Sequence, residues 1–210
     1  MGAGGHAKVV ADTLKLSGRE ILGFVTPNMG GGSTFCGKKI LGDDSVISKY
    51  SPDVTEIVNG VGSLPGKNLR WQLAERMRKH GYSFVTVIHP NAVIASDVIL
   101  DEGVQIMAGV VIQAGSEIGK DSIINTGALI DHDCEVAENC HIAPGVVLSG
   151  GIVIKKYTHI GTGAKIIQNI TVHERCTVAA GTVIYKDIPS TMLVKQKLDT
   201  IMEKREDDRA

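Results

Sequence analysis

The chain has few aromatic residues, no excess of charge of either sign and no long apolar run. Phe, Trp and Tyr make up 4% of its 210 residues, and 22 Lys and Arg stand against 23 Asp and Glu, for a formal net charge of −1. This balance gives no electrostatic reason to expect nucleic acid or an anionic membrane as a partner. No apolar run approaches the ~20 residues that a membrane span needs, and no signal peptide opens the chain. We therefore expect a cytoplasmic protein.

The sequence indicates neither a disulfide framework nor a metal site. None of the cysteines forms a Cys-x-x-Cys pair, and Cys134, Cys140 and Cys176 share one phase of the repeat described next. That phase otherwise holds Ala, Val, Ser, Thr or Ile, so we predict small buried thiols rather than a disulfide framework. His and Asp residues in the repeat offer no third ligand at a suitable spacing, so we predict no metal site.

A six-residue repeat runs without one insertion from Asn91 to Lys186. The fourth position of every block is aliphatic, the second is small or β-branched, and the first is usually Gly, Asp or Asn. A period of six is neither helical nor simply alternating. Short strands separated by regular corners explain it, with three blocks making one triangular coil, the aliphatic side chains inside, and turn-forming residues at the corners. We predict about five stacked coils, spaced roughly 4.8 Å apart.

The first 86 residues show a different pattern. We predict a helix around Val9–Leu14, a strand within 20–25, a strand within 56–61, a helix within 68–80 and a strand within 84–88. This alternation indicates a small Rossmann-like α/β domain with a parallel sheet. Its glycine-rich turns, at 2–6 and 60–63, would place backbone N–H groups at a helix N-terminus and at a strand end, where they suit a phosphate; plain turns are the alternative.

Met1 directly precedes the first glycine turn, although such a turn normally follows a buried strand. We interpret this as a sheet that lacks its first strand, with the natural start upstream of Met1. The expected organisation is an acceptor-binding domain over 1–86, a β-helix over 87–188 and a C-terminal tail over 189–210. The polar residues after Leu198 are expected to form a short helix or to be disordered.

Three segments, at 2–12, 81–95 and 124–151, resemble the bacterial sugar O- and N-acetyltransferases of the sialic-acid acetyltransferase and UDP-4-amino-sugar acetyltransferase family. The resemblance extends from Gly2 to about Asp187. It implies a left-handed parallel β-helix, a homotrimer with active sites between subunits, a sugar or nucleotide-sugar acceptor on the N-terminal domain, and acetyl-CoA as co-substrate with no tightly bound cofactor.

The sequence departs from the family pattern in two places. Thr26-Pro27-Asn28 stands where relatives acting on UDP-sugars carry an acidic pair, which puts the uridine group in question. Met192-Leu193-Val194-Lys195-Gln196 replaces the usual C-terminal ending, so the matching CoA contacts are open.

His132 is the candidate general base, and Asp133 is the candidate partner that orients it. The pKa of an unperturbed histidine suits proton transfer near neutral pH, and His132 ends its block at a corner, where a side chain can leave the prism. A plain surface histidine is the alternative for His132. For Asp133 the alternative is a corner residue that bonds its own backbone.

The resemblance also implies roles for other residues. His141 would contact the acetyl thioester, and its third block position faces outward from the prism. Asn125 could bond the acceptor sugar or could be a structural corner residue. The remaining expectations name backbone contacts to CoA at Gly150, Thr162 and Ala180, and acceptor contacts at Gly4, Gly5, His6, Gly62, Ser63 and Arg70.

The sequence thus predicts acetyl transfer to a sugar by direct attack in a ternary complex. The inward phase of Cys134 disfavours a covalent thiol intermediate. The leading acceptor is the amino group of a nucleotide-linked 4-amino sugar used for surface glycans. The alternatives are sialic acid O-acetylation and a catalytically silent scaffold that only binds sugar or partner subunits.

Overall fold

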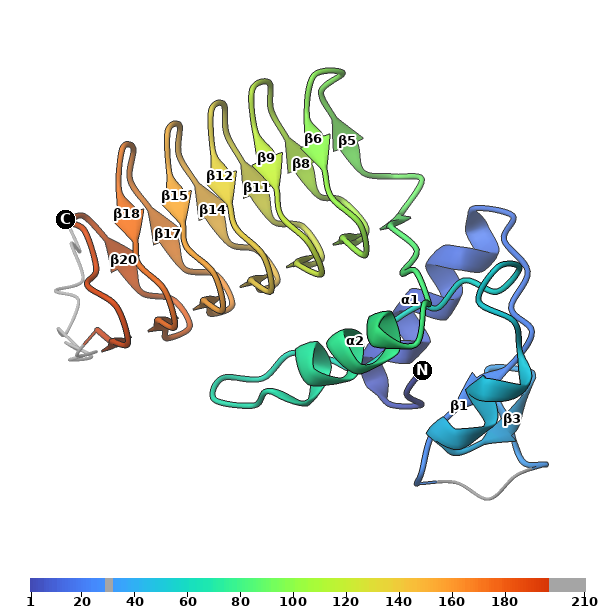
Figure 1. Ribbon diagram of the computed structural model, residues 1–210. Coiled ribbons are helices and arrows are strands. Elements are labelled where there is room, and N and C mark those ends of the chain that lie inside the picture. Colours follow the sequence, from blue (N-terminus) through green and yellow to red (C-terminus); the bar gives the residue numbers. More distant parts are fainter. Residues whose placement is uncertain (29–31, 197–210) are drawn as a thin grey trace, which may run out of the picture.

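The computed structural model describes residues 1–28 and 32–196, so the expectation for the chain after Leu198 lies outside the described residues. The first part of the chain is a small α/β unit (Figure 1). Its elements are α1 (Gly5–Leu16), β1 (Phe24–Val25), β2 (Thr34–Phe35), β3 (Lys38–Gly42), the 3-10 helix η1 (Asp44–Lys49) and α2 (Leu69–Lys79).

The strands of this unit form a small sheet in the order β1-β3-β2, with β1 parallel to β3 and β2 antiparallel to it. Both predicted helices are present. The predicted strand at 56–61 is reduced to one parallel bridge between Ile57 and Phe84. An apolar core of Val25, Ile47, Ile57, Ala74, Met77, Tyr82 and Phe84 lies between the sheet, η1 and α2.

The rest of the described chain is a left-handed parallel β-helix, as the repeat and the family resemblance predict. Each six-residue block contributes one two-residue strand, and β4 and β21 add one strand at either end. The strands are β4 (Val87–Ile88), β5 (Val93–Ile94), β6 (Ile99–Leu100), β7 (Gln105–Ile106), β8 (Val111–Ile112), β9 (Glu117–Ile118), β10 (Ile123–Ile124), β11 (Leu129–Ile130), β12 (Glu135–Val136), β13 (His141–Ile142), β14 (Val147–Leu148), β15 (Val153–Ile154), β16 (His159–Ile160), β17 (Lys165–Ile166), β18 (Thr171–Val172), β19 (Thr177–Val178), β20 (Val183–Ile184) and β21 (Leu193–Val194).

Three sheets form the sides of the prism, and from β4 to β20 each strand residue pairs with the residue 18 positions further on, whereas Thr177 of β19 pairs with Leu193 of β21, 16 positions on. The sheets have the orders β21-β19-β16-β13-β10-β7-β4, β20-β17-β14-β11-β8-β5 and β18-β15-β12-β9-β6. We call them the seven-stranded, six-stranded and five-stranded sheets. The aliphatic fourth positions fill the prism, with Ile106, Ile124 and Ile142 fully buried in one column. The predicted 84–88 strand is divided, because Phe84 pairs in the α/β unit and Val87 opens the seven-stranded sheet.

The residue at the first position of each block forms a corner of the prism. Every block start from Gly103 to Gly181 has a φ between +57° and +75°, a conformation that Gly, Asn and Asp adopt most readily. Two block starts depart from those residue types, Tyr157 with φ +61° and Arg175 with φ +58°. The Arg175 guanidinium lies 4.7 Å from the Tyr157 ring centroid, and the Trp71 ring lies 5.3 Å from it. This stack helps to offset the backbone strain and fastens α2 to the β-helix.

The α/β unit packs against the seven-stranded sheet at the N-terminal end of the prism (Figure 1). Met107 is fully buried against Val10 and Leu14 of α1 and against Val85 and Val87. On α2, Arg78 donates hydrogen bonds to both carboxylate oxygens of Asp121, at 2.6 and 3.0 Å. Apolar packing and a buried ion pair therefore join the two parts of the chain.

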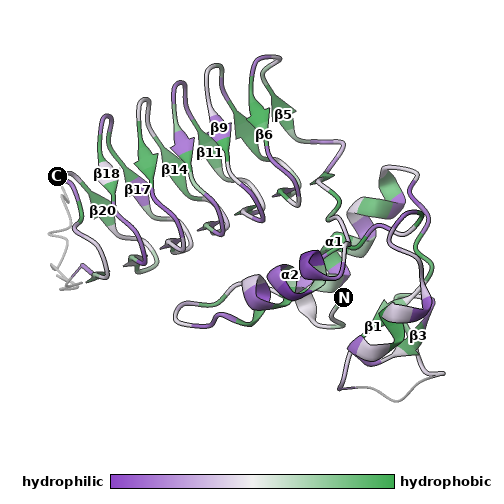
Figure 2. Ribbon diagram, in the orientation of Figure 1, coloured by the Kyte–Doolittle hydropathy of each residue, from purple (hydrophilic) through white to green (hydrophobic). Residues whose placement is uncertain are grey.

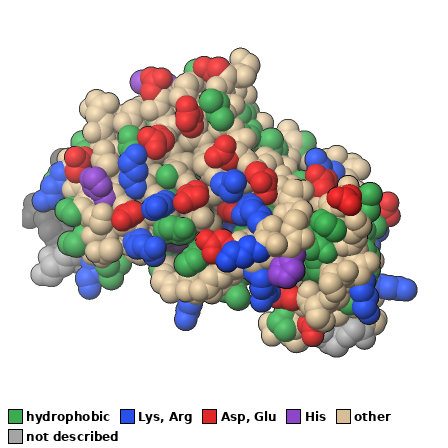
Figure 3. Space-filling view, in the orientation of Figure 1, with side chains coloured by type: hydrophobic (Ala, Val, Ile, Leu, Met, Phe, Trp, Pro, Cys, Tyr) green, Lys and Arg blue, Asp and Glu red, His purple; other side chains and the backbone are tan. Residues whose placement is uncertain are grey.

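The chain's hydrophobic residues gather along the strands of both parts, whereas α2 is largely hydrophilic (Figure 2). On the face shown in Figure 3, acidic and basic side chains are intermingled, in keeping with the balanced composition. Within the described residues, no helix has both the length and the apolar character that crossing a membrane requires.

The predicted buried thiols are confirmed. Cys134, Cys140 and Cys176 are each at most 2% exposed, and each donates a hydrogen bond to a backbone carbonyl 13 to 15 residues further along the chain. Burial raises the pKa of the Cys140 thiol to about 12 and also raises that of Cys134. These thiols fill the prism and are poor nucleophiles.

Candidate active site

The candidate residues of the β-helix lie at two corners, on opposite edges of the six-stranded sheet. Asn125 precedes β11 at one edge, and His132 follows β11 at the other. We call these the Asn125 corner and the His132 corner. Gly150 lies one coil beyond His132, whereas Thr162 and Ala180 stack at the Asn125 corner, where the Gly181 amide bonds the Thr162 carbonyl. The predicted site residues are thus divided into two groups within one chain.

The His132 corner holds an imidazole–carboxylate pair. Nδ1 of His132 lies 2.8 Å from Oδ2 of Asp133, and both side chains are exposed, at 63% and 72%. Neighbouring side chains on a straight strand point to opposite faces. Here Asp133 has a φ of +57°, and this turn brings its carboxylate to the same side as the imidazole. The backbone amide of His132 also bonds the Asp131 carboxylate at 2.8 Å.

This contact fixes which nitrogen of His132 can accept a proton. The carboxylate oxygen of Asp133 can only accept a hydrogen bond, so Nδ1 carries the hydrogen and Nε2 has a free lone pair. The hydrogen bond to Asp133, aided by the charge of Asp131, raises the pKa of His132 above its ordinary value. In its deprotonated form the exposed His132 ring therefore offers Nε2 as a proton acceptor, which is the arrangement of a general base.

Two glycines leave room for this pair. A Cβ atom on Gly150 would lie 2.5 Å from both Cε1 and Nε2 of His132. A Cβ atom on Gly115 would lie 2.5 Å from Oδ1 of Asp133. Sequence reasoning assigned Gly150 to CoA and missed Gly115. The repeat carried the signal, since Gly115 stands 18 residues, one full coil, before Asp133.

At the Asn125 corner, His141 is buried between the α/β unit and the β-helix. Its Nδ1 lies 3.1 Å from the Ser63 carbonyl, and its Nε2 lies 3.1 Å from the side-chain nitrogen of Asn125. Oδ1 of Asn125 accepts from the Thr126 amide at 2.8 Å, which fixes the orientation of the Asn125 amide group. His141 therefore donates through Nδ1 and accepts through Nε2 as a neutral ring. Burial, followed by the nearby His159, lowers its pKa to about 3.

The third block position of His141 does face outward from the prism, as predicted, but the α/β unit covers it and leaves it 8% exposed. Both of its ring nitrogens already have partners within the chain. In this arrangement His141 fastens the 60–63 turn to the β-helix, and its contact with an acetyl thioester stays a prediction.

A second histidine, His6, is held by a residue that sequence reasoning missed. Its Nε2 lies 2.7 Å from Oε1 of Gln105, whose Nε2 donates to the Asn59 carbonyl at 2.8 Å. The Asn59 contact fixes the Gln105 amide, so His6 donates through Nε2 and its Nδ1 is an acceptor. Burial lowers the pKa of His6 to about 4, with Arg70 adding to the effect. The signal for Gln105 was weak, since it is one polar residue at an ordinary outward position of the repeat.

Arg70 lies behind the second glycine turn. Its Nη1 donates to the carbonyls of Asn59 and Val61, at 2.9 and 2.7 Å, and its side chain is buried. Burial lowers its pKa to about 10. The turn is thus shaped from within by a buried guanidinium, and Gly62 in this turn approaches His6.

The first glycine turn leaves the N-terminus of α1 open. Gly4 is the N-cap, no side chain caps the helix, and no acidic residue lies in the first turn. A Cβ atom at Gly4 or at Gly5 would have no heavy atom within 4 Å. Uncapped N–H groups at the positive end of a helix dipole suit an anionic group such as a phosphate.

Two family models match the chain, one over the α/β unit and one within the β-helix. The family model described as the PglD N-terminal domain matches residues 1–77, and the bacterial transferase hexapeptide model, of six repeats, matches residues 115–150. No curated protein matched the chain.

Solved structures match over nearly the whole chain. A point variant of GDP-perosamine N-acetyltransferase from Caulobacter crescentus, in complex with CoA and GDP-perosamine, is 36% identical, with 91% of this chain and 90% of that chain covered and a TM-score of 0.83. The acetyltransferase domain of PglB from Neisseria gonorrhoeae FA1090, in complex with acetyl coenzyme A, is 35% identical, with 91% and 92% covered and a TM-score of 0.85. The chain belongs to this family of hexapeptide-repeat sugar acetyltransferases.

WeeI from Acinetobacter baumannii AYE shares the fold, with a TM-score of 0.82 at 24% identity.

In the present acetyltransferase the Thr26-Pro27-Asn28 stretch, which departs from the pattern of relatives acting on UDP-sugars, follows β1 directly. Thr26 is 4% exposed, and its hydroxyl accepts from the Asn28 amide at 3.4 Å. The residues that the structure describes directly after β1, Thr26-Pro27-Asn28, carry no carboxylate, whereas Asp43 follows β3 at the same end of the sheet.

Proposed function

We propose that this chain transfers the acetyl group of acetyl-CoA to the amino group of a nucleotide-linked amino sugar. The observation that carries the proposal is the His132–Asp133 pair, with Nε2 of His132 exposed and free to accept a proton. Two solved relatives more than 30% identical to the chain contain CoA with GDP-perosamine, or acetyl coenzyme A. Acetyl-CoA is a cytoplasmic metabolite, and we place the enzyme in the cytoplasm.

The proposed reaction is a direct transfer. The acceptor nitrogen attacks the thioester carbonyl while Nε2 of His132 takes the N–H proton, so a C–N bond forms and the carbonyl oxygen becomes an oxyanion. The tetrahedral intermediate then collapses, the C–S bond breaks, and the proton held by His132 passes to the departing thiolate. Asp133 keeps the hydrogen on Nδ1 and stabilises the imidazolium that forms between these steps.

We place the acceptor at the two glycine turns. The open N-terminus of α1, at Gly4 and Gly5, would bind a phosphate of the nucleotide, and Nδ1 of His6 would accept a hydrogen bond from the acceptor. Gly62, Ser63 and Asn125 continue this surface toward the β-helix, where Thr162 and Ala180 line the same corner. Arg70 supports the turn from behind.

We also propose that the active enzyme is a homotrimer with its sites between subunits. The outer face of the six-stranded sheet carries a continuous apolar column in which Val93, Val111, Leu129 and Val147 pair in sequence. Leu129 is 42% exposed and Val93 63% exposed in the single chain. A contiguous apolar surface of this kind is typical of an interface.

This column lies between the two corners that share the candidate residues. A neighbouring subunit packed on it would bring its own corner toward His132 or Asn125, so that the two groups of residues could meet across the interface. Within one chain the two corners are seven residues apart along an extended path, and a face of the prism separates them.

The test is acceptor-dependent release of CoA thiol from acetyl-CoA, with a panel of UDP- and GDP-linked 4-amino sugars and free sialic acids. We expect release with a nucleotide-linked amino sugar and loss of release in His132→Ala. If only sialic acid supported CoA release, sialic acid would replace the nucleotide-linked amino sugar as the acceptor. Binding of acetyl-CoA without release in any reaction would favour a silent scaffold.

A further inference from the structure

Gln105 is a polar residue in a buried column of the β-helix. It lies on the outer face of the seven-stranded sheet, between Val87 and Ile123, and it is 1% exposed. At such a place an unsatisfied amide costs free energy, whereas an apolar side chain does not. What Gln105 contributes therefore lies in the hydrogen bonds that it makes.

The two polar atoms of the Gln105 amide bond two different segments of the α/β unit. Its Nε2 donates to the Asn59 carbonyl at 2.8 Å, and its Oε1 accepts from Nε2 of His6 at 2.7 Å. The reverse orientation of the amide would set two oxygen atoms against each other at Asn59. The orientation of the amide is thus determined, and it places the hydrogen of the neutral His6 ring on Nε2.

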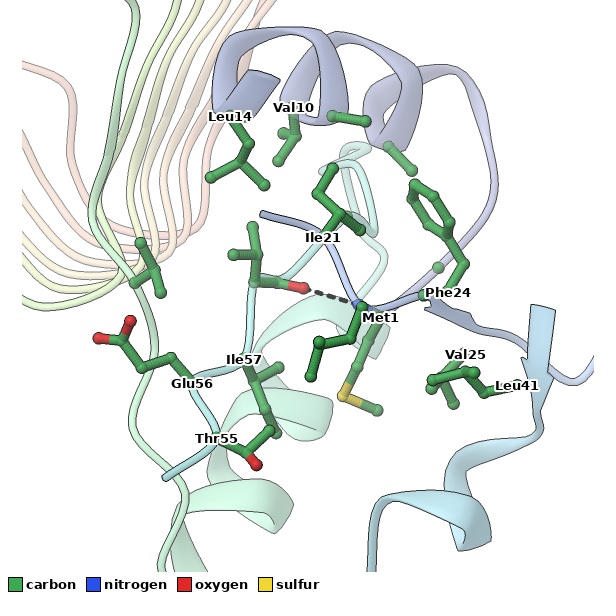
Figure 4. A pocket seen from close by; sticks show the side chains of 18 of the residues that line it. Met1, Val10, Leu14, Ile21, Phe24, Val25, Leu41, Thr55, Glu56 and Ile57 are labelled. Carbon is green, nitrogen blue, oxygen red and sulfur yellow. Dashed lines mark hydrogen bonds between the residues drawn. The ribbon is translucent and has the colours of Figure 1, made fainter. Parts of the chain in front are cut away.

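The Asn59 carbonyl that orients Gln105 is itself held by the α/β unit. Nη1 of Arg70 donates to this carbonyl at 2.9 Å, and the Asn59 side chain donates to the Arg70 carbonyl at 3.0 Å. One residue earlier, the Val58 carbonyl accepts from the Met1 nitrogen at 2.7 Å, a contact drawn at the wall of the cavity in Figure 4. The position of the Asn59 carbonyl therefore does not depend on Gln105 alone.

The other ring nitrogen of His6 is free. Among the described residues, Nδ1 of His6 has no hydrogen-bond partner, and it is open to solvent. Gly62 leaves room beside it, since a Cβ atom at Gly62 would lie 3.4 Å from the His6 Cβ. Gly4 and Gly5, which form the uncapped N-terminus of α1, directly precede His6. A neutral ring with this tautomer accepts a hydrogen bond at Nδ1 and cannot donate one there.

The charges around His6 favour the neutral ring. Arg70 of α2 and His141 of β13 are the charged or titratable groups that act on it. In the part of the chain that the structure describes, no carboxylate forms an ion pair with His6. Burial, followed by Arg70, lowers the pKa of His6 to about 4. Near neutral pH, His6 therefore lacks the positive charge with which a histidine pairs with a phosphate.

We propose that Gln105 is a positioning residue that makes His6 a hydrogen-bond acceptor for the amino sugar, so that His6 does not bind the phosphate. This inference rests on the proposed function, which places the acceptor at the two glycine turns. The group that Nδ1 binds must carry an N–H or O–H, as the amine and the hydroxyls of a sugar do. The phosphate at Gly4 and Gly5 would lie between nucleoside and sugar. Because His6 is bonded to the β-helix, its Nδ1 is assigned to the sugar.

A double-mutant cycle tests whether Gln105 acts through His6. In Gln105→Met the side chain keeps nearly the same volume and loses both hydrogen bonds. We expect Gln105→Met and His6→Ala each to raise KM for a nucleotide-linked amino sugar about tenfold, with KM for acetyl-CoA unchanged. The double variant should be no worse than His6→Ala alone. Additive losses would mean that Gln105 only supports the fold, and would overturn the proposal.

Two controls complete the kinetic test. Gln72→Met replaces an exposed glutamine of α2 and should leave both KM values unchanged. The affinity for GDP and for UDP, measured by calorimetry, should be the same in Gln105→Met as in the unchanged protein, because neither nucleotide carries the sugar. A tenfold loss of affinity for GDP or UDP would assign Nδ1 of His6 to the nucleotide, and the assignment to the sugar would be wrong.

Nitrogen NMR of the imidazole rings tests the state of His6 without acetyl transfer and without a change at Gln105. The chain has seven histidines, and the signals of His6 are those that His6→Ala lacks. With GDP or UDP bound at pH 6, we expect a neutral His6 ring with its hydrogen on Nε2. A doubly protonated ring would make His6 a phosphate ligand and contradict the proposal. If no acceptor supported CoA release, the proposed function would fail, and this measurement would still decide between a neutral and a charged His6.

Discussion

Gly150 and His132 occupy the same corner in successive coils, and the absence of a side chain at Gly150 is what lets the imidazole approach the backbone closely. A Cβ atom there would come within 2.5 Å of both Cε1 and Nε2. The position of the proposed base is thus set from two directions, by the Asp133 carboxylate at Nδ1 and by the Gly150 backbone beneath the ring.

Gly150→Ala should therefore impair catalysis without unfolding the protein. The φ of Gly150 is not in the left-handed region, so alanine fits the backbone, and the exposed imidazole can swing away from the new methyl group. We expect kcat to fall by about 10²-fold, as a misplaced catalytic group does, with a melting temperature within about 2 °C. Ser149→Ala, on the neighbouring residue, is the control and should retain kcat. An unchanged kcat in Gly150→Ala would mean that the ring position does not matter.

Replacing Asp133 should change the pH dependence as well as the rate. The pKa of His132 is raised by its hydrogen bond to Asp133, and the base works only when deprotonated, so activity is lost as the pH falls through this pKa. In Asp133→Asn we expect the acidic limb of kcat/KM to move to lower pH, and kcat to fall at least about 10-fold. Steady-state kinetics from pH 5 to 9 would measure both. If the acidic limb of kcat/KM did not move in Asp133→Asn, a group other than His132 would be responsible for that limb.

The ion pair between Arg78 and Asp121 should be a major contact between the two parts of the chain. The Asp121 side chain is 2% exposed, so Arg78→Met leaves a buried carboxylate without its partner. We expect a loss of about 3–5 kcal/mol in the free energy of unfolding. Arg76→Met removes a pair on the same helix in which Arg76 is 51% exposed, and should cost less than about 1 kcal/mol. Urea denaturation of both variants makes the comparison.

A charge on the apolar column of the six-stranded sheet should disrupt assembly. We expect Leu129→Asp to shift the protein from trimer to monomer in light scattering and to reduce kcat/KM by at least about 10-fold, because the site would lose its neighbouring subunit. Ile99→Asp is the matched control, since Ile99 is 56% exposed but lies on the five-stranded sheet. A trimer that survives Leu129→Asp would place the interface elsewhere.

The buried histidines should make the fold sensitive to mild acid. The folded pKa of His6 is about 4 and that of His141 about 3, both below the unfolded value near 6.5. Below pH 6.5 the unfolded chain therefore binds protons that the folded chain does not, and the free energy of unfolding falls as the pH drops from 6.5 toward 4. His6→Gln should reduce this slope by about 1.4 kcal/mol per pH unit. Denaturation at pH 7, 6 and 5 would measure it.

The β-helix could be predicted from sequence because one packing rule repeats in every block. Ile124 and Ile142 are buried for the same reason, and Asp133 and Gly115 share a corner that the six-residue period alone specifies. The short strands β2 and β3 carried no such repetition. Their signal is local, in Cys36-Gly37, whose φ values of +50° and +76° make a tight hairpin turn.

The site was less predictable because its key contacts join distant parts of the chain. The block phase of His141 correctly places it outside the prism, but only the docked α/β unit buries it and supplies Ser63. Gln105 has the same phase and meets His6, which lies 99 residues away. In contrast, His132 and Asp133 are adjacent, and a turn at a known repeat position was enough to bring them together.

The 18-residue register between coils also limits how this protein can change in length. Because every corner residue bears directly on the one above it, losing or gaining a single residue between Asn91 and Ile184 would rotate all later side chains onto wrong faces. A whole coil can be removed or duplicated without that penalty. Variation in length between Asn91 and Ile184 should therefore come in steps of 18 residues.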